Sequence, residues 1–584
     1  MRESRCVKPD PEGAHGFRRG LDPPRSRMWG SGGGFQGPDT ATCRADVHNV
    51  VLQSDQYRMS EQQRPKRLPI HPGLVITALV ACVAYGWIAI PPATLGPDAD
   101  PTHYAVLAGY YSESMRGSVD PYTEFVYRAS RFPPVWPALL GLLGGGPDTP
   151  GLLKAVTSLC AIATVLLTWA WIQREHRDPW LATVLATALA LCPGFFILNL
   201  EPHSEALGMV LMLGALLVAT RAPVDRADVY RGAALFALLA LTRAICVVFA
   251  PAVTVWILRA RSGLYRAAMA GLLVALPLCL WLLFRSTIPQ NVGYSMQWNP
   301  ERDLASVGGW SGFVLSQPWR LAENLVLSFA PVGGALSRVA GFALCALALI
   351  GWVKRLVANR LDAWVLGSYV GVLFVWPYPN ETERFLLFLL PIVLVSAATA
   401  ASMLARRTTP GRVGWMPAGF LLLLAIASGP SIVHGVSRAT LQIDPELASE
   451  KRGEEYFRAS SPEEATAVAE HNARKRTTAE ALRGVVPEGQ CVYAVQITYV
   501  FAHGGVPAAE FPPGFLEGTV GAEQLQRCNF FYVVGGQFVG EGAPTIDFFA
   551  ALRSATRPVL VSTQETPAGP MIAAAALERL PPPP

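Results

Sequence analysis

Apolar segments of about 20 residues recur from Gly73 to about Val433, and they constrain the fold more than any other feature of this chain. A helix needs roughly 20 mostly apolar residues to cross the hydrocarbon core of a bilayer. The 584 residues are 51% hydrophobic and only 16% charged, which excludes an ordinary soluble protein. We therefore predict a polytopic α-helical membrane protein.

The hydropathy pattern predicts about eleven transmembrane helices between residues 73 and 433. The fifth and sixth are short and meet at LTRAICV, which is typical of broken or tilted segments. The predicted spans lie at about 73–92, 150–172, 180–198, 205–220, 230–243, 245–258, 267–286, 335–353, 363–377, 384–405 and 413–433.

Clusters of lysine and arginine indicate which loops face the cytoplasm. RPKR, QREHRD, RAPVDRADVYR, RARSGLYR, VKRLVANR and ARRTTPGR all fall on one side of the predicted spans. The opposite side receives the loops 93–149 and 287–334 and everything after residue 433, and its loops are comparatively acidic. We expect a cytoplasmic N-terminus, an extracytoplasmic C-terminal domain and any reaction on the extracytoplasmic face.

The N-terminal segment 1–72 is polar and rich in Gly, Pro and Arg, so we expect a disordered cytoplasmic tail. Met59 is an alternative native start, because an apolar run follows it closely. After about residue 434 the pattern changes, and the soluble segment 434–584 alternates predicted helices and strands, which predicts a small α/β domain. Its two cysteines, Cys491 and Cys528, either form a disulfide or remain free core thiols.

The first predicted external loop contains GPDADPTHYAVLAGYY, whose apolar residues follow a helical period. Asp100 before Pro101 is typical of a helix N-cap, and Tyr104 lies on the apolar face, so we expect a helix lying flat at the membrane surface. Further along, Glu124 and Arg128 stand one helical turn apart.

NLEPHSEALG places Glu205 at the edge of an otherwise apolar run. An acid at membrane depth is a functional candidate by default, although interfacial capping explains it equally well. Arg243 and Arg384 are cations on the face where positive charge is scarce. A guanidinium suits a phosphate because its donors match two oxygens, and the alternative for each arginine alone is snorkelling at the interface.

The order of these motifs resembles the GT-C glycosyltransferases, in particular the protein mannosyltransferase and aminoarabinose transferase type that uses polyprenyl-phosphate sugars. The resemblance covers about 73–405, from the acidic first loop through RFPPVWP, NLEPHSE and LTR to ETERFLLFLLP. Relatives often carry an acidic residue directly after the first-loop aspartate. Here Pro101 stands at that position and Asp98 lies two residues before Asp100, so a metal-assisted reaction is not indicated, and a divalent cation remains open.

The resemblance implies an inverting transfer of a sugar from a polyprenyl-phosphate donor to an acceptor hydroxyl. Asp100 would be the catalytic base, because the reaction needs a carboxylate for the acceptor proton and cations for the departing phosphate. The phosphate would bind Arg243 and Arg384, with Arg131 as a third candidate. Glu124 and Glu205 would orient sugar or acceptor, and Asp98 and Tyr104 would lie beside the substrate.

Other function classes fit the sequence less well. Although the net charge is +5, the basic residues form no continuous patch, so nucleic acid is not an expected partner. No phosphate-cradling glycine loop opens a helix, which disfavours a nucleotide-driven pump, and no cofactor is indicated. A transporter or flippase is the main alternative, but it predicts internal repeats that the chain lacks. The compact loops favour a bacterial inner membrane. The sequence leaves open the sugar, which is a hexose, a pentose or an amino sugar, and the acceptor, which is a protein, a lipid or a glycan.

Tryptophans in the second predicted external loop offer a sugar-binding surface, but membrane-belt anchoring explains such residues more often. The residues concerned are Trp298, Trp310 and Trp319, with Gln297, Asn299, Glu301 and Asp303 among them.

Overall fold

A computed structural model describes most of the chain after residue 70. The described residues are 71–89, 94–96, 99–130, 132–221, 226–260, 262–287, 309–331, 333–376, 382–408, 416–452, 454–511, 527–534, 556–566 and 569–580. They belong to one compact unit, Ile70–Pro584. The predicted tail and the alternative start at Met59 lie outside the described residues.

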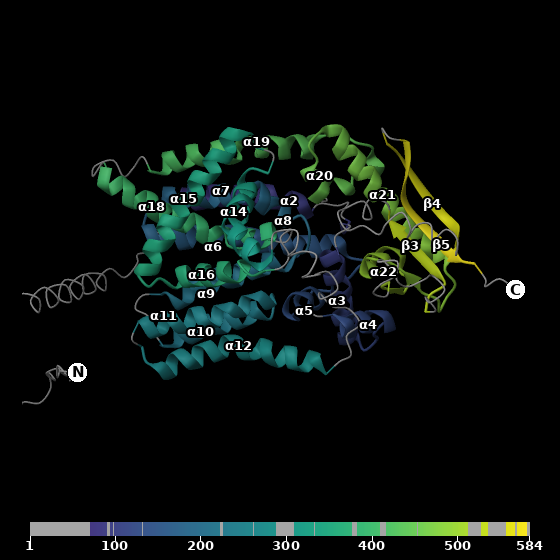
Figure 1. Cartoon of the computed structure of the whole chain (residues 1–584), viewed down its shortest axis with the longest axis horizontal. Helices are drawn as coiled ribbons and strands as arrows, with labels where there is room; N and C mark the ends of the chain where they lie inside the picture. The colour runs from purple at the N-terminus through teal and green to yellow at the C-terminus, as the bar shows by residue number, and fades with distance from the viewer. Residues whose placement is uncertain are drawn as a thin grey trace, which may run out of the picture. The chain divides into compact units, whose positions relative to one another are not determined.

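Within the described residues, each segment predicted to span the membrane is largely helical (Figure 1). These helices are α2 (Pro72–Ala89), α6 (Pro150–His176), α7 (Pro179–Ala190), α8 (Pro193–Leu198), α9 (Ser204–Ala219), α10 (Arg226–Ala240), η1 (Ala244–Val248), α11 (Phe249–Arg259), α12 (Leu264–Ser286), α15 (Ala335–Val357), α16 (Leu361–Leu373), α17 (Thr382–Leu387), α18 (Leu390–Thr408) and α19 (Met416–Thr440). Within the described residues, five of them, α2, α6, α12, α15 and α19, are long and apolar enough to cross a membrane. The chain is an integral membrane protein, and the full count of eleven spans stays a prediction.

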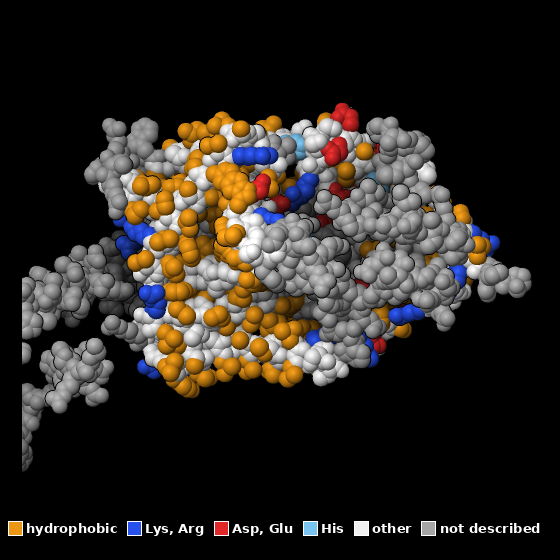
Figure 2. All heavy atoms as spheres, viewed as in Figure 1, with side chains coloured by type: hydrophobic (Ala, Val, Ile, Leu, Met, Phe, Trp, Pro, Cys, Tyr) orange, Lys and Arg blue, Asp and Glu red, His pale blue; other side chains and the backbone are white. Residues whose placement is uncertain are grey.

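Large apolar side chains face outward along these helices, as expected for surfaces that contact lipid. Leu79, Val83 and Leu264 are 61%, 75% and 73% exposed. Figure 2 shows hydrophobic side chains spread over the helical part, with basic side chains at the end away from the strands and also at the strand end.

The basic loops after α6 and after α15 meet at one end of the helices. Arg355 donates to Glu175 at 3.2 Å and to Asp362 at 2.6 Å, and Arg360 also pairs with Glu175. The two loops therefore share one end, as the lysine and arginine pattern predicts. That this end is cytoplasmic stays a prediction.

The first predicted external loop forms three helices, α3 (Ala99–Arg116), α4 (Pro121–Ala129) and α5 (Val135–Leu142). α4 begins where the Asp120 carboxylate accepts hydrogen bonds from the backbone N–H groups of Tyr122 and Thr123. α3 packs between α5 and the C-terminal domain, and its orientation at the membrane surface stays a prediction. Part of the second predicted loop is also helical, as α14 (Gly309–Phe329).

The segment after α19 forms the predicted α/β domain. Its elements are η5 (Pro445–Leu447), η6 (Glu450–Arg452), α20 (Glu454–Arg458), α21 (Pro462–Val485), β1 (Val492–Tyr493), α22 (Ile497–Gly504), β2 (Ala508–Ala509), β3 (Phe530–Val534), β4 (Thr556–Thr566) and β5 (Gly569–Arg579). The strand order is β2-β1-β3-β5-β4; β1, β2 and β3 run parallel, and β5 is antiparallel to β3 and β4. A disulfide joins Cys491 before β1 to Cys528 before β3.

The carboxyl group of Glu510, directly after β2, is largely shielded from water, and this burial raises its pKa to about 7. An unfolded glutamate ionises near pH 4.5, so between pH 4.5 and 7 the unfolded state releases a proton that the folded state keeps. The free energy of unfolding therefore falls as the pH rises through this window.

We expect Glu510→Gln to raise the free energy of unfolding by about 1 to 2 kcal/mol at pH 8, a value discounted for partial exposure, and to change little at pH 4.5. Thermal denaturation of the full chain in detergent at both pH values measures the difference. An equal effect at pH 4.5 and pH 8 would contradict the assignment of the titration to Glu510.

Candidate active site

Four charged side chains that lie far apart in the sequence form one chain of ion pairs. Arg384 of α17 forms ion pairs with both carboxylates: its Nη2 lies 2.7 Å from Asp100 Oδ2, and its Nε lies 3.0 Å from Glu205 Oε1. Arg243 pairs with the same oxygen of Glu205. Glu205 and Arg243 are 1% and 6% exposed, whereas Asp100 and Arg384 are 19% and 22% exposed. The accessible end of the cluster is therefore Asp100 with Arg384.

Local structure explains why these groups converge. α3 begins at Ala99, so Asp100 lies in its first turn instead of preceding the helix as an N-cap. Glu205 lies in the first turn of α9, and Arg243 stands in extended backbone between α10 and η1. A Cβ on Gly208, one turn after Glu205, would lie 2.9 Å from Phe388 and 3.5 Å from Arg243 Cδ, so this glycine leaves room for the guanidinium.

Aromatic rings complete the wall around the arginines. The guanidinium carbon of Arg243 lies 4.9 Å from the centre of the Phe385 ring, and that of Arg384 lies 5.8 Å from the same ring. Cation–π contacts of this kind hold a guanidinium where water is scarce. Tyr104 donates to Ser204 at 3.0 Å, which links α3 directly to the start of α9.

The other predicted site residues lie elsewhere or outside the described residues. Glu124 pairs with Arg128 on α4, where both side chains are exposed. Asp98 and Arg131 lie outside the described residues, as do Trp298, Gln297, Asn299, Glu301 and Asp303, and the side chain of Trp310 is not described. Trp319 is exposed on α14. Within the described part of the chain, no three His, Cys, Asp or Glu side chains gather as a metal site.

Sequence reasoning missed a second buried ion pair beside the cluster. Lys154 of α6 donates from Nζ to Glu201 Oε1 at 3.2 Å, and the two side chains are 1% and 2% exposed. A Cβ on Gly96 would lie 2.8 Å from the same Glu201 oxygen, so the backbone before Asp100 passes close to this pair. The available signal was a lysine inside an apolar run, which is costly enough to require a partner.

We expect Lys154→Met to lower the free energy of unfolding by about 2 kcal/mol, because the buried Glu201 carboxylate loses a partner. The double variant Lys154→Met/Glu201→Leu should recover most of this loss, since apolar pairs often replace buried ion pairs without cost. Thermal denaturation of the three proteins measures both values. A double variant less stable than the single one would contradict this account.

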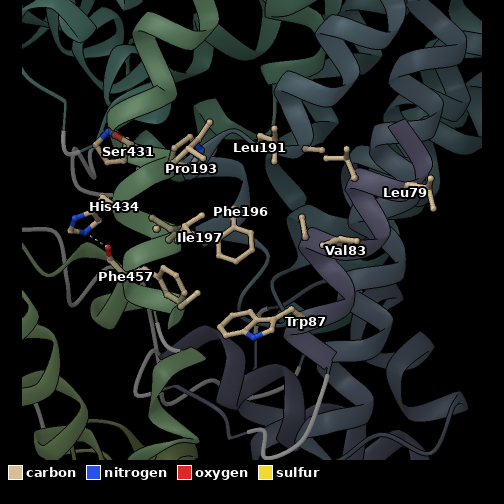
Figure 3. A pocket seen from close by; sticks show the side chains of 18 residues that line it. Leu79, Val83, Trp87, Leu191, Pro193, Phe196, Ile197, Ser431, His434 and Phe457 are labelled. Atoms are coloured by element: carbon tan, nitrogen blue, oxygen red, sulfur yellow. Dashed lines mark hydrogen bonds between the residues drawn. The ribbon is translucent and has the colours of Figure 1, made fainter. Parts of the chain in front are cut away.

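An apolar cavity of about 550 Å³ is lined by residues of α2, α8 and α19 and by Phe457 of α20 (Figure 3). The rings of Trp87, Phe196 and Phe457 pack together, with ring centres 5.5 to 6.4 Å apart. The next residue, Arg458, pairs with Glu383 at 3.3 Å, and Glu383 directly precedes Arg384. Phe457 in the cavity wall is therefore linked to Arg384 of the ionic cluster through the ion pair of Arg458 with Glu383.

Comparisons with known proteins find only distant structural similarity. No protein-family model and no curated protein matches the sequence. The oligosaccharyltransferase of Archaeoglobus fulgidus, crystallised with zinc and sulfate, has 14% identity and a TM-score of 0.48, over 86% of this chain and 72% of that chain.

ArnT from Cupriavidus metallidurans has 13% identity and a TM-score of 0.49 in the apo state, over 86% of this chain and 97% of that chain. Bound to undecaprenyl phosphate, it has 14% identity and a TM-score of 0.48, over 87% and 98%. Since these TM-scores are below 0.5, the proposed function rests on the residues of the site. These solved structures are of GT-C glycosyltransferases, the same class that the sequence motifs resemble.

Proposed function

We propose that this chain is a membrane glycosyltransferase that moves a sugar from a polyprenyl-phosphate donor to an acceptor hydroxyl on the extracytoplasmic face. The observation that carries the proposal is the cluster in which Arg384 bridges Asp100 and Glu205 while Arg243 supports Glu205. It combines an accessible carboxylate with two cations at an edge that substrate can reach.

The charges in the cluster suit the chemistry of a sugar phosphodiester. Two carboxylates and two guanidinium groups balance one another, and the donor phosphate adds one negative charge. The Arg384 guanidinium already pairs with Asp100, so an arriving phosphate competes with Asp100 for it. A guanidinium binds two oxygens of a phosphate well. Release from Arg384 would leave the Asp100 carboxylate available to the acceptor.

The reaction is then a single displacement. Asp100 accepts the proton of the acceptor hydroxyl as that oxygen bonds to the anomeric carbon. The bond from the anomeric carbon to the phosphate oxygen breaks, and polyprenyl phosphate leaves with one more negative charge. The cluster has gained one proton, so its positive charge grows as the charge of the leaving group grows, and Arg384 and Arg243 stabilise that group. Attack opposite the leaving group inverts the anomeric centre.

The apolar cavity supports a lipid donor. Its lining is almost wholly apolar, and Leu79, Val83 and Val436 at its edge are well exposed on the lipid-facing surface. The isoprenoid chain would lie in this cavity, with its far end still in the bilayer. The phosphate would lie beyond Phe457 and Arg458, at Arg384. Tyr104, whose hydroxyl contacts Ser204, would line the sugar side of the site.

The testing experiment is transfer of a labelled sugar from a polyprenyl-phosphate donor by the purified protein. Protein, lipid and glycan acceptors are offered separately, with hexose and pentose donors. We expect inversion at the anomeric carbon and release of polyprenyl phosphate. Donor binding without transfer to any acceptor, together with movement of the lipid across vesicle membranes, would instead favour a flippase.

A further inference from the structure

Helix α22 of the C-terminal domain contacts α3, whose first turn carries Asp100. Thr102 Oγ1 and Thr498 Oγ1 share a hydrogen bond of 3.0 Å, and the two side chains are 0% and 3% exposed. The first turn of α3 is therefore attached to α22 two residues after Asp100.

A hydrophobic layer fixes the rest of this contact. Val106 and Leu107 of α3 share one buried cluster with Tyr122 of α4 and with Ile497 and Val500 of α22. The Tyr122 hydroxyl also donates to the Ile497 carbonyl at 3.3 Å. Its ring centre lies 4.3 Å from that of Phe501. Since the layer is apolar and closely packed, movement of α22 shifts α3 with it.

The polar contact differs from the apolar layer in what it controls. Apolar packing is non-directional, whereas a buried hydroxyl pair fixes the rotation and height of the turn that carries it. Thr102 follows Asp100 by two residues in the same turn, and Arg384 forms an ion pair with the Asp100 carboxylate. The direction of the Asp100 carboxylate therefore depends on its ion pair with Arg384 and on the hydrogen bond by which Thr498 holds the turn that carries Asp100.

We propose that α22 is a positioning element for the reaction and that Thr498 is a positioning residue that acts through Thr102 on Asp100. This inference rests on the proposed function, because it gives a task to the domain that follows the membrane helices. Small displacements of a reacting group slow catalysis much more than they weaken substrate binding. Loss of this contact should therefore lower kcat more than it raises KM.

Thr498→Val removes the hydroxyl and keeps the shape of the side chain. We expect kcat for sugar transfer to fall about tenfold, the effect of one lost hydrogen bond, with KM for the donor within about twofold of the wild-type value. Thr498→Ser should restore most of kcat. The matched control is Thr478→Val in α21, a buried threonine of the same domain whose hydroxyl donates to the Arg474 carbonyl of its own helix at 2.8 Å.

Two further measurements separate positioning from general destabilisation. In an Asp100→Asn background, Thr498→Val should cause no additional loss, because the group that it positions is already inactive. Independently of any activity, amide hydrogen exchange in residues 99–103 should rise in Thr498→Val and not in Thr478→Val.

The outcomes separate this inference from the proposed function. Unchanged exchange in residues 99–103, or equal kcat losses in the Thr498 and Thr478 variants, would overturn the role of Thr498. If exchange rises in Thr498→Val but the wild-type protein transfers no sugar, the attachment of α3 to α22 is upheld and the glycosyltransferase proposal is overturned.

Discussion

Asp100→Asn is expected to lower the rate of sugar transfer by at least about a hundredfold, within the range of a lost general base. Asparagine keeps the shape of the side chain and its contact with Arg384, but it cannot take the proton of the acceptor hydroxyl. Donor binding should remain within a few-fold, since Arg243 and Arg384 are both present. Transfer kinetics and equilibrium donor binding, measured on the same purified protein, test the two parts separately.

Asp98→Asn is the matched control for this variant. It removes the same charge two residues earlier in the chain, and we expect a much smaller loss of transfer, because Asp98 is predicted to lie beside the substrate without taking the proton. Full activity of Asp100→Asn would remove Asp100 from the role of base. Equal losses in the two variants would show that the negative charge of the loop matters more than the position of one carboxylate.

Glu205→Gln should have the largest effect on stability, because it leaves two arginines side by side with one carboxylate fewer. Glu205 is 1% exposed and contacts both Arg243 and Arg384. An arginine cannot release its proton, so the uncompensated charge stays in place. Loss of one partner of a buried pair costs about 3–5 kcal/mol. Thermal denaturation in detergent measures the loss, and added inorganic phosphate should reverse part of it by supplying the missing negative charge.

Glu383→Gln provides the comparison, since Glu383 lies on the same helix as Arg384 and pairs with Arg458, which is 39% exposed. An ion pair this open to water contributes roughly 1 kcal/mol or less. A loss at Glu383 as large as that at Glu205 would show that stability depends on α17 as a whole and not on the buried cluster.

Periodicity and residue type predicted much of this molecule. The apolar runs located the helices, because burial in lipid leaves a continuous signal in the sequence. The rarity of charge in and near those runs also drew attention to Glu205, Arg243 and Arg384, which the structure brings together with Asp100. A charge at membrane depth is costly, so its presence is informative even when its partner is unknown.

Partners that are distant in the chain could not be predicted in the same way. Nothing in the local pattern joins Lys154 to Glu201, or Thr102 to Thr498, because these contacts depend on how helices pack. The protein partners of α3 could not be predicted for a related reason: an amphipathic period shows that one face is buried, but not which element buries it. β5 was missed because its run of alanines is not typical of a strand.

The contact between Thr102 and Thr498 spans 396 residues of sequence, and this distance has a consequence for biosynthesis. During translation the loop with Asp100 leaves the ribosome early, whereas α22 is made after all the membrane helices. Long-range contacts of this kind form late in folding. The loop with Asp100 would therefore enter the membrane before α22, which positions the Asp100 carboxylate, has been made. The protein would become catalytically active only after the domain that contains α22 has folded.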